Sequence, residues 1–121
     1  MIGIGVDLVD VDRIRAAIAR TPGLATRLFT EGERAYALAA TDPAERFAVR
    51  FAAKEAVMKA LGVGLGAIDW HDVEVVRADS GAPSLRLTGR AAALADAAGV
   101  TAWKLTLTHT RTLAEAVAVA L

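Results

Sequence analysis

The stretch Phe51-Ala-Ala-Lys-Glu-Ala-Val-Met-Lys-Ala-Leu-Gly62, followed by Val63-Gly64, decides how the chain is organised. Its pattern predicts the second half of a long helix that runs into a glycine loop. At about 100° per residue, several small or apolar side chains and one lysine fall within about 60° of Glu55 on the helical wheel. These are Ala48, Phe51, Ala52, Met58 and Lys59. A carboxylate in such a sector loses hydration, so Glu55 needs a partner cation or a proton.

Glu55 and Lys59 are four residues apart, and two interpretations stay open for them. They could form an ordinary surface ion pair, worth about 0.2–0.5 kcal/mol. The functional interpretation gains weight from a second isolated carboxylate, Asp7, in Ile2-Gly-Ile-Gly-Val-Asp-Leu-Val9. This stretch alternates with period two and predicts a strand. Asp7 shares a face with two glycines, where another backbone or a ligand can approach; the alternative is a strand-end carboxylate that faces water.

Composition limits the classes of protein that this chain can belong to. Its 121 residues suit a single domain, residues 1–121. The apolar fraction of 55% and the mean hydropathy of +0.40 are high for a small monomer and hint at a buried subunit interface. A formal net charge of zero argues against a general nucleic-acid binder.

Cysteine and membrane signals are missing from the sequence. Without cysteine there is no disulfide framework and no thiolate nucleophile or metal ligand. No apolar run approaches the roughly 18 residues of a membrane span. The N-terminal stretch lacks the basic and then apolar pattern of a signal peptide. We therefore expect a soluble, cytoplasmic protein that binds neither membranes nor nucleic acid.

Start and stop signals predict the helices. Asp10 is a natural N-cap for a short helix that Thr21-Pro22-Gly23 ends. Thr30-Glu-Gly-Glu33 is a capping box and opens a helix through about Ala40. Asp42 as N-cap and Pro43 at the first helical position then predict a long helix from Pro43 to Leu61. Gly62 ends it, because glycine can take the left-handed conformation.

The remainder of the chain predicts a sheet. Residues 72–77 and 84–88 form a hairpin, a short Ala-rich helix covers 89–98, and a second hairpin joins 102–109 to 114–121. The last strand is apolar on both faces, as a central or interface strand would be. The predicted fold class is α+β, a mainly antiparallel sheet packed against a long helix and shorter helices.

Three further features are ambiguous. Between residues 13 and 27 the charged side chains are all arginines, namely Arg13, Arg15, Arg20 and Arg27. They form either a solvated face or a basic patch for an acidic partner surface. His109 follows the apolar face of its strand and is either a strand-end residue or a catalytic group. The loop Gly62-Val-Gly-Leu-Gly66 could approach a phosphate, but it follows a helix C-terminus, which makes the signal weak.

Three separated segments resemble one family. They are Gly3-Ile-Gly-Val-Asp-Leu-Val-Asp-Val-Asp-Arg-Ile14, the stretch from Phe51 to Gly62, and Leu107-Thr-His-Thr110. Together they are similar to the bacterial holo-[acyl-carrier-protein] synthases, the small stand-alone 4′-phosphopantetheinyl transferases. Phe29-Thr30 with Glu33, and Gly81-Ala-Pro83, extend the resemblance over nearly the whole chain.

The resemblance implies a reaction. The 4′-phosphopantetheine arm of coenzyme A would pass to a serine of apo-acyl carrier protein, with release of adenosine 3′,5′-bisphosphate. The enzyme would depend on Mg²⁺ and serve fatty acid biosynthesis, with polyketide carriers as an open alternative. It would be a homotrimer, with each active site in a cleft between neighbouring subunits.

The resemblance also assigns roles to residues. Asp7 and Glu55 match the family's metal ligands. The positions that line the diphosphate and pantetheine site are matched by Lys59, Gly62 and Gly64. Loops near the adenosine bisphosphate, contributed by a neighbouring chain, are matched by Gly81-Ala-Pro83 and His109-Thr110. Arg13 matches a carrier-protein contact, and Arg20 and Arg27 extend the same basic run. Val57-Met58 and Thr110-Arg-Thr112 are the positions that vary.

The residues themselves suit this chemistry. Two carboxylates without cysteine or paired histidines fit a hard octahedral ion such as Mg²⁺ better than zinc. Lys59 would add positive charge near the leaving group. Glu55 is the candidate base for the carrier serine, directly or through a metal-bound water. Two rivals stay open: another Mg²⁺-dependent enzyme, such as a diphosphate hydrolase, and a non-catalytic interaction subunit in which Glu55 and Lys59 merely form an ion pair.

Overall fold

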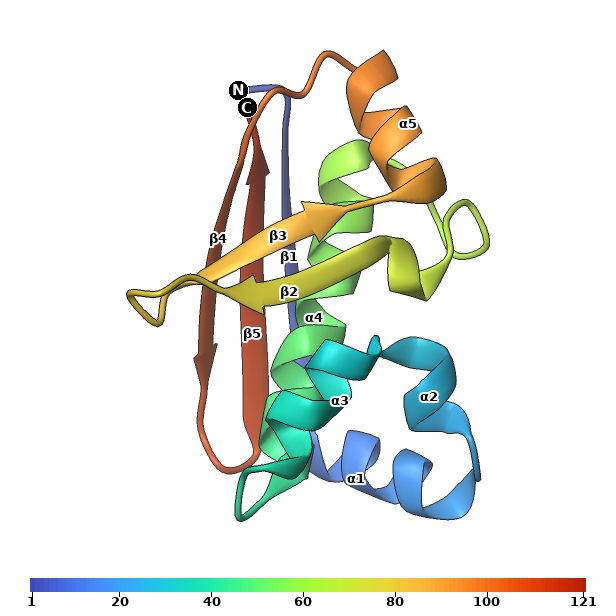
Figure 1. Cartoon of the computed structure of the whole chain (residues 1–121), viewed down its shortest axis with the longest axis vertical. Coiled ribbons are helices and arrows are strands. Elements are labelled where there is room, and N and C mark those ends of the chain that lie inside the picture. Colours follow the sequence, from blue (N-terminus) through green and yellow to red (C-terminus); the bar gives the residue numbers. More distant parts are fainter.

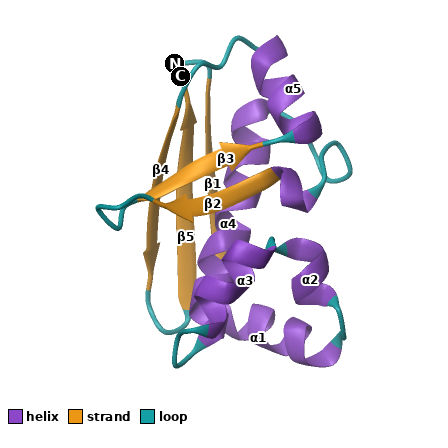
Figure 2. Cartoon of the chain, viewed as in Figure 1, coloured by secondary structure: helices purple, strands orange, loops and turns teal.

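A computed structural model describes residues 1–121, and Figure 1 shows the course of the chain. In chain order the elements are β1 (Gly3–Asp10), α1 (Val11–Arg20), α2 (Leu24–Leu28), α3 (Glu31–Leu38), α4 (Pro43–Leu61), the 3-10 turn η1 (Trp70–Asp72), β2 (Val73–Arg77), β3 (Pro83–Leu87), α5 (Gly89–Ala97), β4 (Trp103–His109) and β5 (Leu113–Ala120). This is the predicted α+β class, with helices gathered on one side of the strands (Figure 2). No helix is long and apolar enough to cross a bilayer.

The strands form two antiparallel sheets. The larger sheet has the order β1-β5-β4. Strand β5, which is apolar on both faces, is therefore central, as its sequence predicts. Asp7 pairs with Ala116 and Val6 with Val117 in this sheet. The second sheet is the hairpin β2-β3, which crosses in front of the first sheet in Figure 1. The sequence therefore gives the strands correctly, but not their division into two sheets.

Helix α4 lies directly on strand β1, and glycine makes this approach possible. A Cβ atom on Gly5 would lie 1.9 Å from the carbonyl oxygen of Ala56, and one on Gly3 would lie 1.9 Å from that of Ala60. Such distances exclude any side chain at either glycine. The face of β1 that carries Asp7 is thus held against α4, and the sequence prediction of a close backbone approach is confirmed.

The opposite face of β1 is apolar and open. Ile4, Val6 and Leu8 are 58%, 49% and 61% exposed. Alternation along a strand places these side chains on the face away from α4. The apolar excess in the composition therefore lies partly on the surface of the single chain.

The helix boundaries mostly agree with their sequence signals. Asp10 caps α1 by accepting from the Asp12 amide at 3.0 Å, the Thr30 capping box is formed, and Gly62 ends α4 with φ of +70°. Helix α3 ends at Leu38, two residues earlier than expected.

Helix α2 was not predicted, because its N-cap is Gly23, which offers no side-chain cap. Asp42 occupies the N-cap of α4, but makes no capping bond there. Its carboxylate instead accepts from Arg15 at 2.5 Å. A polar residue in a cap position thus marks the start of a helix without always capping it.

Candidate active site

Asp7 and Glu55, 48 residues apart in the sequence, line one cavity of about 500 Å³. Asp7 comes from the glycine face of β1, and Glu55 comes from the face of α4 packed against that strand. The rest of the lining is mainly apolar and comes from β1, α1, α2, α4 and the segment after α4. It includes Ile14, Leu24, Leu28, Phe51, Leu65 and Trp70. The two predicted carboxylates are therefore brought together.

Lys59 completes this acidic centre. Its Nζ lies 3.1 Å from Asp7 Oδ1 and donates to the carbonyl oxygen of Val6 at 2.8 Å. The ammonium therefore pairs with Asp7 rather than with Glu55, so of the two interpretations left open by the sequence, the ordinary i, i+4 ion pair within α4 is not the one that forms. The reason is geometric: one turn of α4 past Glu55, the lysine reaches the adjacent backbone of β1.

Glu55 is left without a cation of its own. Burial raises the pKa of its carboxyl group, the negative charge of Asp7 raises it further, and Lys59 opposes both effects. Asp7, Glu55 and Lys59 together carry one net negative charge when all three are ionised, and the same cavity is also lined by the opposite charges of Asp10 and Arg13. A raised pKa with a charged partner in a cleft is typical of functional sites.

The donor set at this centre fits a hard divalent cation. No histidine, cysteine or further acid joins Asp7 and Glu55 to form a cluster of three ligands that could enclose an ion. Mg²⁺ is ordinarily held by one or two carboxylates, with water and substrate phosphates filling the other positions. The pair therefore suits an ion that arrives with a phosphorylated ligand, and does not suit a closed structural metal site.

The basic run divides into residues with different surroundings. Arg13 lines the same cavity as Asp7 and Glu55. Arg15 is bound to Asp12 and Asp42. Arg20 and Arg27 are exposed and lie outside the cavity lining. Only Arg13 of the predicted patch therefore borders the acidic centre.

The glycines of the loop Gly62-Val-Gly-Leu-Gly66 do not line the cavity in this chain. The N–H group of Gly62 is used to end α4, where it donates to the carbonyl of Lys59 at 3.0 Å. Gly64 is exposed, with nothing within 4 Å of the position that a Cβ atom would take. Leu65 is the residue of this loop that reaches the cavity.

Pro83 and His109 line a different cavity of about 310 Å³. His109 Nδ1 lies 3.7 Å from Glu45 Oε2 at its edge. Thr110 lies in the turn between β4 and β5, outside this lining, where its hydroxyl accepts from the Leu113 amide at 3.0 Å. Pro83 and His109 are thus together, but they are apart from Asp7 and Glu55.

Three arginines that sequence reasoning missed dominate this second cavity. The guanidinium groups of Arg46, Arg50 and Arg77 lie 3.9, 4.3 and 4.9 Å from the centre of the Tyr36 ring. Arg50 is buried, its pKa is lowered by that burial, and its Nε has no hydrogen-bond partner. Tyr36 attracts the three cations to its ring face. The cluster is therefore preorganised for an anion with several oxygens.

The two cavities share no residue and use different faces of α4. Arg46 and Arg50 point roughly 140–180° away from Glu55 around the helix axis, at about 100° per residue. Only the i, i+4 spacing of these two arginines could have indicated the second cavity from the sequence. A single chain thus presents two separate cavities on opposite sides of its central helix.

Comparison with known proteins decides the family. The sequence model of one protein family, the 4′-phosphopantetheinyl transferase superfamily, matches residues 3–119. The holo-[acyl-carrier-protein] synthase of Frankia casuarinae is 52% identical over 120 residues, which cover 99% of this chain and 97% of the relative. The chain belongs to this family. It is accordingly a transferase of the holo-[acyl-carrier-protein] synthase type.

Solved structures agree with this placement. The crystal structure of the Neisseria meningitidis holo-[acyl-carrier-protein] synthase has a TM-score of 0.90 at 28% identity, covering all of this chain and 98% of that one. The Helicobacter pylori synthase, crystallised in complex with coenzyme A, has a TM-score of 0.85 at 27% identity, covering 98% of this chain and 99% of that one. The resemblance stated from the sequence is therefore confirmed, and so is the fold class.

Proposed function

We propose that the chain transfers 4′-phosphopantetheine from coenzyme A to a serine of apo-acyl carrier protein and releases adenosine 3′,5′-bisphosphate. The serine oxygen forms the new bond to phosphorus as the anhydride bond breaks. The observation that carries this proposal is the pair Asp7 and Glu55, set in one apolar cavity beside Lys59. We assign residues 1–121 to one transferase domain in fatty acid biosynthesis, with polyketide carriers as an open alternative.

Asp7 and Glu55 would hold Mg²⁺, which would neutralise charge on the diphosphate of coenzyme A. Lys59 holds positive charge at the same place and can donate to a phosphate oxygen when it leaves Asp7. Its side chain is 54% exposed, so this movement meets little steric resistance. Glu55 is also the proposed base that would take the proton of the carrier serine.

The arginine cavity would bind the adenosine bisphosphate part of coenzyme A. Pro83 and His109 border it, and Arg46, Arg50 and Arg77 supply three positive charges. Charge-assisted hydrogen bonds to phosphate are among the stronger interactions available to a protein. The proposed binding site for the adenosine bisphosphate thus consists of the three arginines together with Pro83 and His109. Thr110 lies in the turn that follows His109 and does not line this cavity.

Two copies of the chain would be needed for one complete site. The acidic cavity and the arginine cavity lie on opposite faces of α4, whereas one coenzyme A molecule carries both the diphosphate and the 3′-phosphate. The open apolar face of β1, with Ile4, Val6 and Leu8, is suited to bury against another subunit. We therefore propose the homotrimer that the family resemblance implies, with sites between neighbours.

Arg13 is the proposed contact to the carrier protein, because it is exposed and also borders the cavity of Asp7 and Glu55. Arg20 and Arg27, which are exposed farther along α1 and α2, would add longer-range attraction to an acidic carrier surface. The arginines would orient the carrier so that its serine approaches the phosphorus in line. A cytoplasmic location is part of the same proposal.

The test is incubation of the chain with coenzyme A, Mg²⁺ and an apo-acyl carrier protein, followed by intact mass measurement of the carrier. We expect the carrier to gain one phosphopantetheine group, and a serine-to-alanine carrier to gain none. Cleavage of coenzyme A without modification of the carrier would instead support the hydrolase alternative. No reaction of either kind would contradict the proposal.

A further inference from the structure

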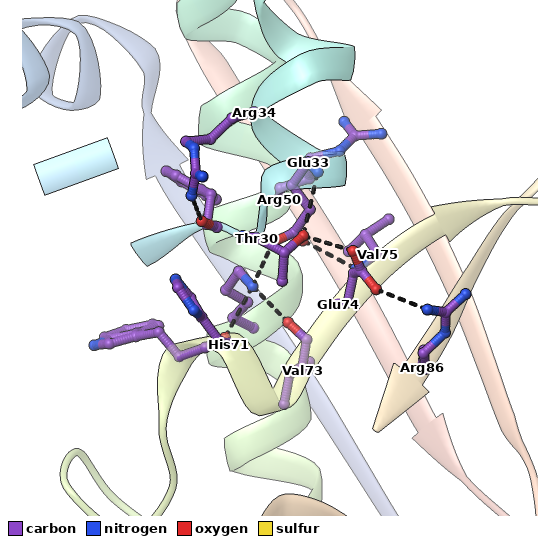
Figure 3. A network of polar contacts seen from close by, with 12 residues as sticks. Thr30, Glu33, Arg34, Arg50, His71, Val73, Glu74, Val75 and Arg86 are labelled. Atoms are coloured by element: carbon purple, nitrogen blue, oxygen red, sulfur yellow. Dashed lines mark hydrogen bonds and ion pairs between the residues drawn. The ribbon is translucent and has the colours of Figure 1, made fainter. Parts of the chain in front are cut away.

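A buried ion pair lies behind the wall of the acidic cavity. Lys54 Nζ and Glu33 Oε1 are 2.7 Å apart, and their side chains are 1% and 0% exposed. Figure 3 shows the network around Glu33, which connects helix α3 to strand β2. None of its buried members lines the cavity of Asp7 and Glu55.

All three N–H donors of the Lys54 ammonium group and both carboxylate oxygens of Glu33 have a specific partner. Besides Glu33, Lys54 donates to the carbonyl oxygens of Trp70 at 2.9 Å and Val73 at 2.5 Å. Glu33 in turn accepts from the backbone amides of Thr30 and Val75, each at 2.9 Å. The pair therefore ties α3, α4, η1 and β2 together with directional bonds.

One of these bonds reaches the candidate active site through Trp70. The Trp70 ring stacks on Phe51, with the ring centres 5.2 Å apart and the planes at 23°. Both rings line the cavity that holds Asp7 and Glu55. Lys54 therefore holds the backbone of Trp70, whose ring forms part of the cavity wall. Glu55, the next residue of α4, lines the same cavity.

Stability alone is a weak reason for such a pair. Removing two charges from water is costly, and burial lowers the pKa of Lys54 although the charge of Glu33 opposes it. Apolar side chains of similar volume are often as stabilising as a buried ion pair. What apolar side chains cannot supply is a hydrogen bond to a chosen carbonyl. The buried pair is therefore better explained by its hydrogen bonds, which position the backbone, than by a gain in stability.

We infer that Lys54, with Glu33 as its counterion, is a positioning residue that holds Trp70 and thereby shapes the cavity for the pantetheine arm of coenzyme A. The inference rests on the proposed function. It concerns a residue whose side chain does not line the cavity and which acts through one carbonyl group of η1.

The kinetic test compares Lys54→Met with Val57→Ala, which shortens a fully buried side chain elsewhere on α4. Both variants should lower Tm. We expect Lys54→Met to raise KM for coenzyme A about tenfold while kcat changes less than about threefold. Val57→Ala should leave KM within about twofold of the wild type. Equal KM values in the two variants would overturn the inference.

A double-mutant cycle with Trp70→Ala tests whether Lys54 acts through Trp70. If it does, Lys54→Met should add less than about twofold to the KM of the Trp70→Ala variant. A full additional increase would contradict the proposed route. If Lys54→Met does not fold, Glu33→Gln removes the counterion with little change in shape, and the same KM increase is expected.

Fluorescence gives a readout that does not depend on activity. The chain has two tryptophans, so Trp103→Phe leaves Trp70 as the reporter. In this background we expect Lys54→Met to shift Trp70 emission to longer wavelength and to raise the acrylamide quenching constant about twofold. Val57→Ala should change neither quantity. Unchanged emission and quenching would overturn the inference. An inactive wild-type chain would instead overturn the proposed function, and the fluorescence experiment would still test whether Lys54 positions Trp70.

Discussion

At the scale of residues, the candidate site depends on how three charged groups share a small apolar space. Lys59 lies against Asp7, and the pKa of Glu55 rises because Glu55 is partly buried and faces a second carboxylate. The arrangement leaves negative charge unsatisfied in the isolated chain, which costs stability and favours a bound cation. Function and stability therefore oppose each other at Glu55.

A pH-dependent stability change should follow at Glu55. Because the native pKa is raised above its ordinary value of about 4.3, the native chain holds this proton more tightly than the unfolded chain does. The favourable contribution is present at low pH and is lost as pH rises through the native pKa. We expect Glu55→Gln to have a higher Tm than the wild type at pH 7, with a difference that shrinks as pH falls. Thermal unfolding between pH 4 and 8 measures it, and a constant difference would contradict the explanation.

The arginine cavity predicts selectivity for the 3′-phosphate of coenzyme A. Arg77→Gln removes one of the three cations, so KM for coenzyme A should rise about tenfold, the magnitude of a lost charge-assisted hydrogen bond, while KM for 3′-dephospho-coenzyme A should hardly change. Arg86→Gln is the matched control, because Arg86 lies outside the cavity, on strand β3 of the same hairpin. Equal effects of Arg77→Gln on the two substrates would place the 3′-phosphate elsewhere.

Arg13 should act on the carrier protein more than on coenzyme A. Charge reversal in Arg13→Glu replaces attraction with repulsion toward an acidic carrier surface. We expect KM for the carrier to rise at least about tenfold, and KM for coenzyme A to change by less than about threefold. The same reversal at Arg90, which is exposed but lies on α5, provides the control. A similar loss for both substrates of the Arg13 variant would refute the carrier contact.

At the scale of elements, the contact of β1 with α4 holds the two carboxylates together. Gly5→Ala would force a Cβ atom to within 1.9 Å of the Ala56 carbonyl oxygen, so strand and helix must separate. We expect a loss of about 3 kcal/mol in the free energy of unfolding, at the upper end of overpacking effects. Gly64→Ala meets no atom within 4 Å and should change stability by less than about 0.5 kcal/mol. Denaturant unfolding of both variants measures the difference, and equal stabilities would contradict the close packing.

Sequence reasoning succeeded where a local signal had one physical meaning. The capping box at Thr30 and the left-handed Gly62 gave helix ends, and the alternation around Asp7 gave its strand. It failed where contacts are made between distant segments. Spacing left the partner of Lys59 undecided, and that partner is Asp7 on a distant strand. Arg77 joins Arg46 and Arg50 only because a hairpin folds over α3 and α4. Such pairings depend on tertiary distance, which spacing along the chain does not encode.

At the scale of the whole molecule, the proposed trimer explains two features together. A single chain has two separate cavities and an open apolar strand face. Val6 lies in the middle of that face, 49% exposed. We expect Val6→Glu to convert trimers into monomers in sedimentation measurements and to lower transfer activity at least about tenfold, because the shared site is then incomplete. A trimeric and fully active Val6→Glu variant would exclude this face as the interface.

In the proposed mechanism, Asp7 and Glu55 jointly hold one divalent ion on the diphosphate of coenzyme A. The most direct measurement is Mn²⁺ binding, followed by electron paramagnetic resonance in the presence of coenzyme A, for the wild type, Asp7→Asn and Glu55→Gln. We predict one tightly bound ion per chain in the wild type, and binding weakened at least about tenfold in each folded variant. Mn²⁺ binding of wild-type strength in both variants would contradict the account.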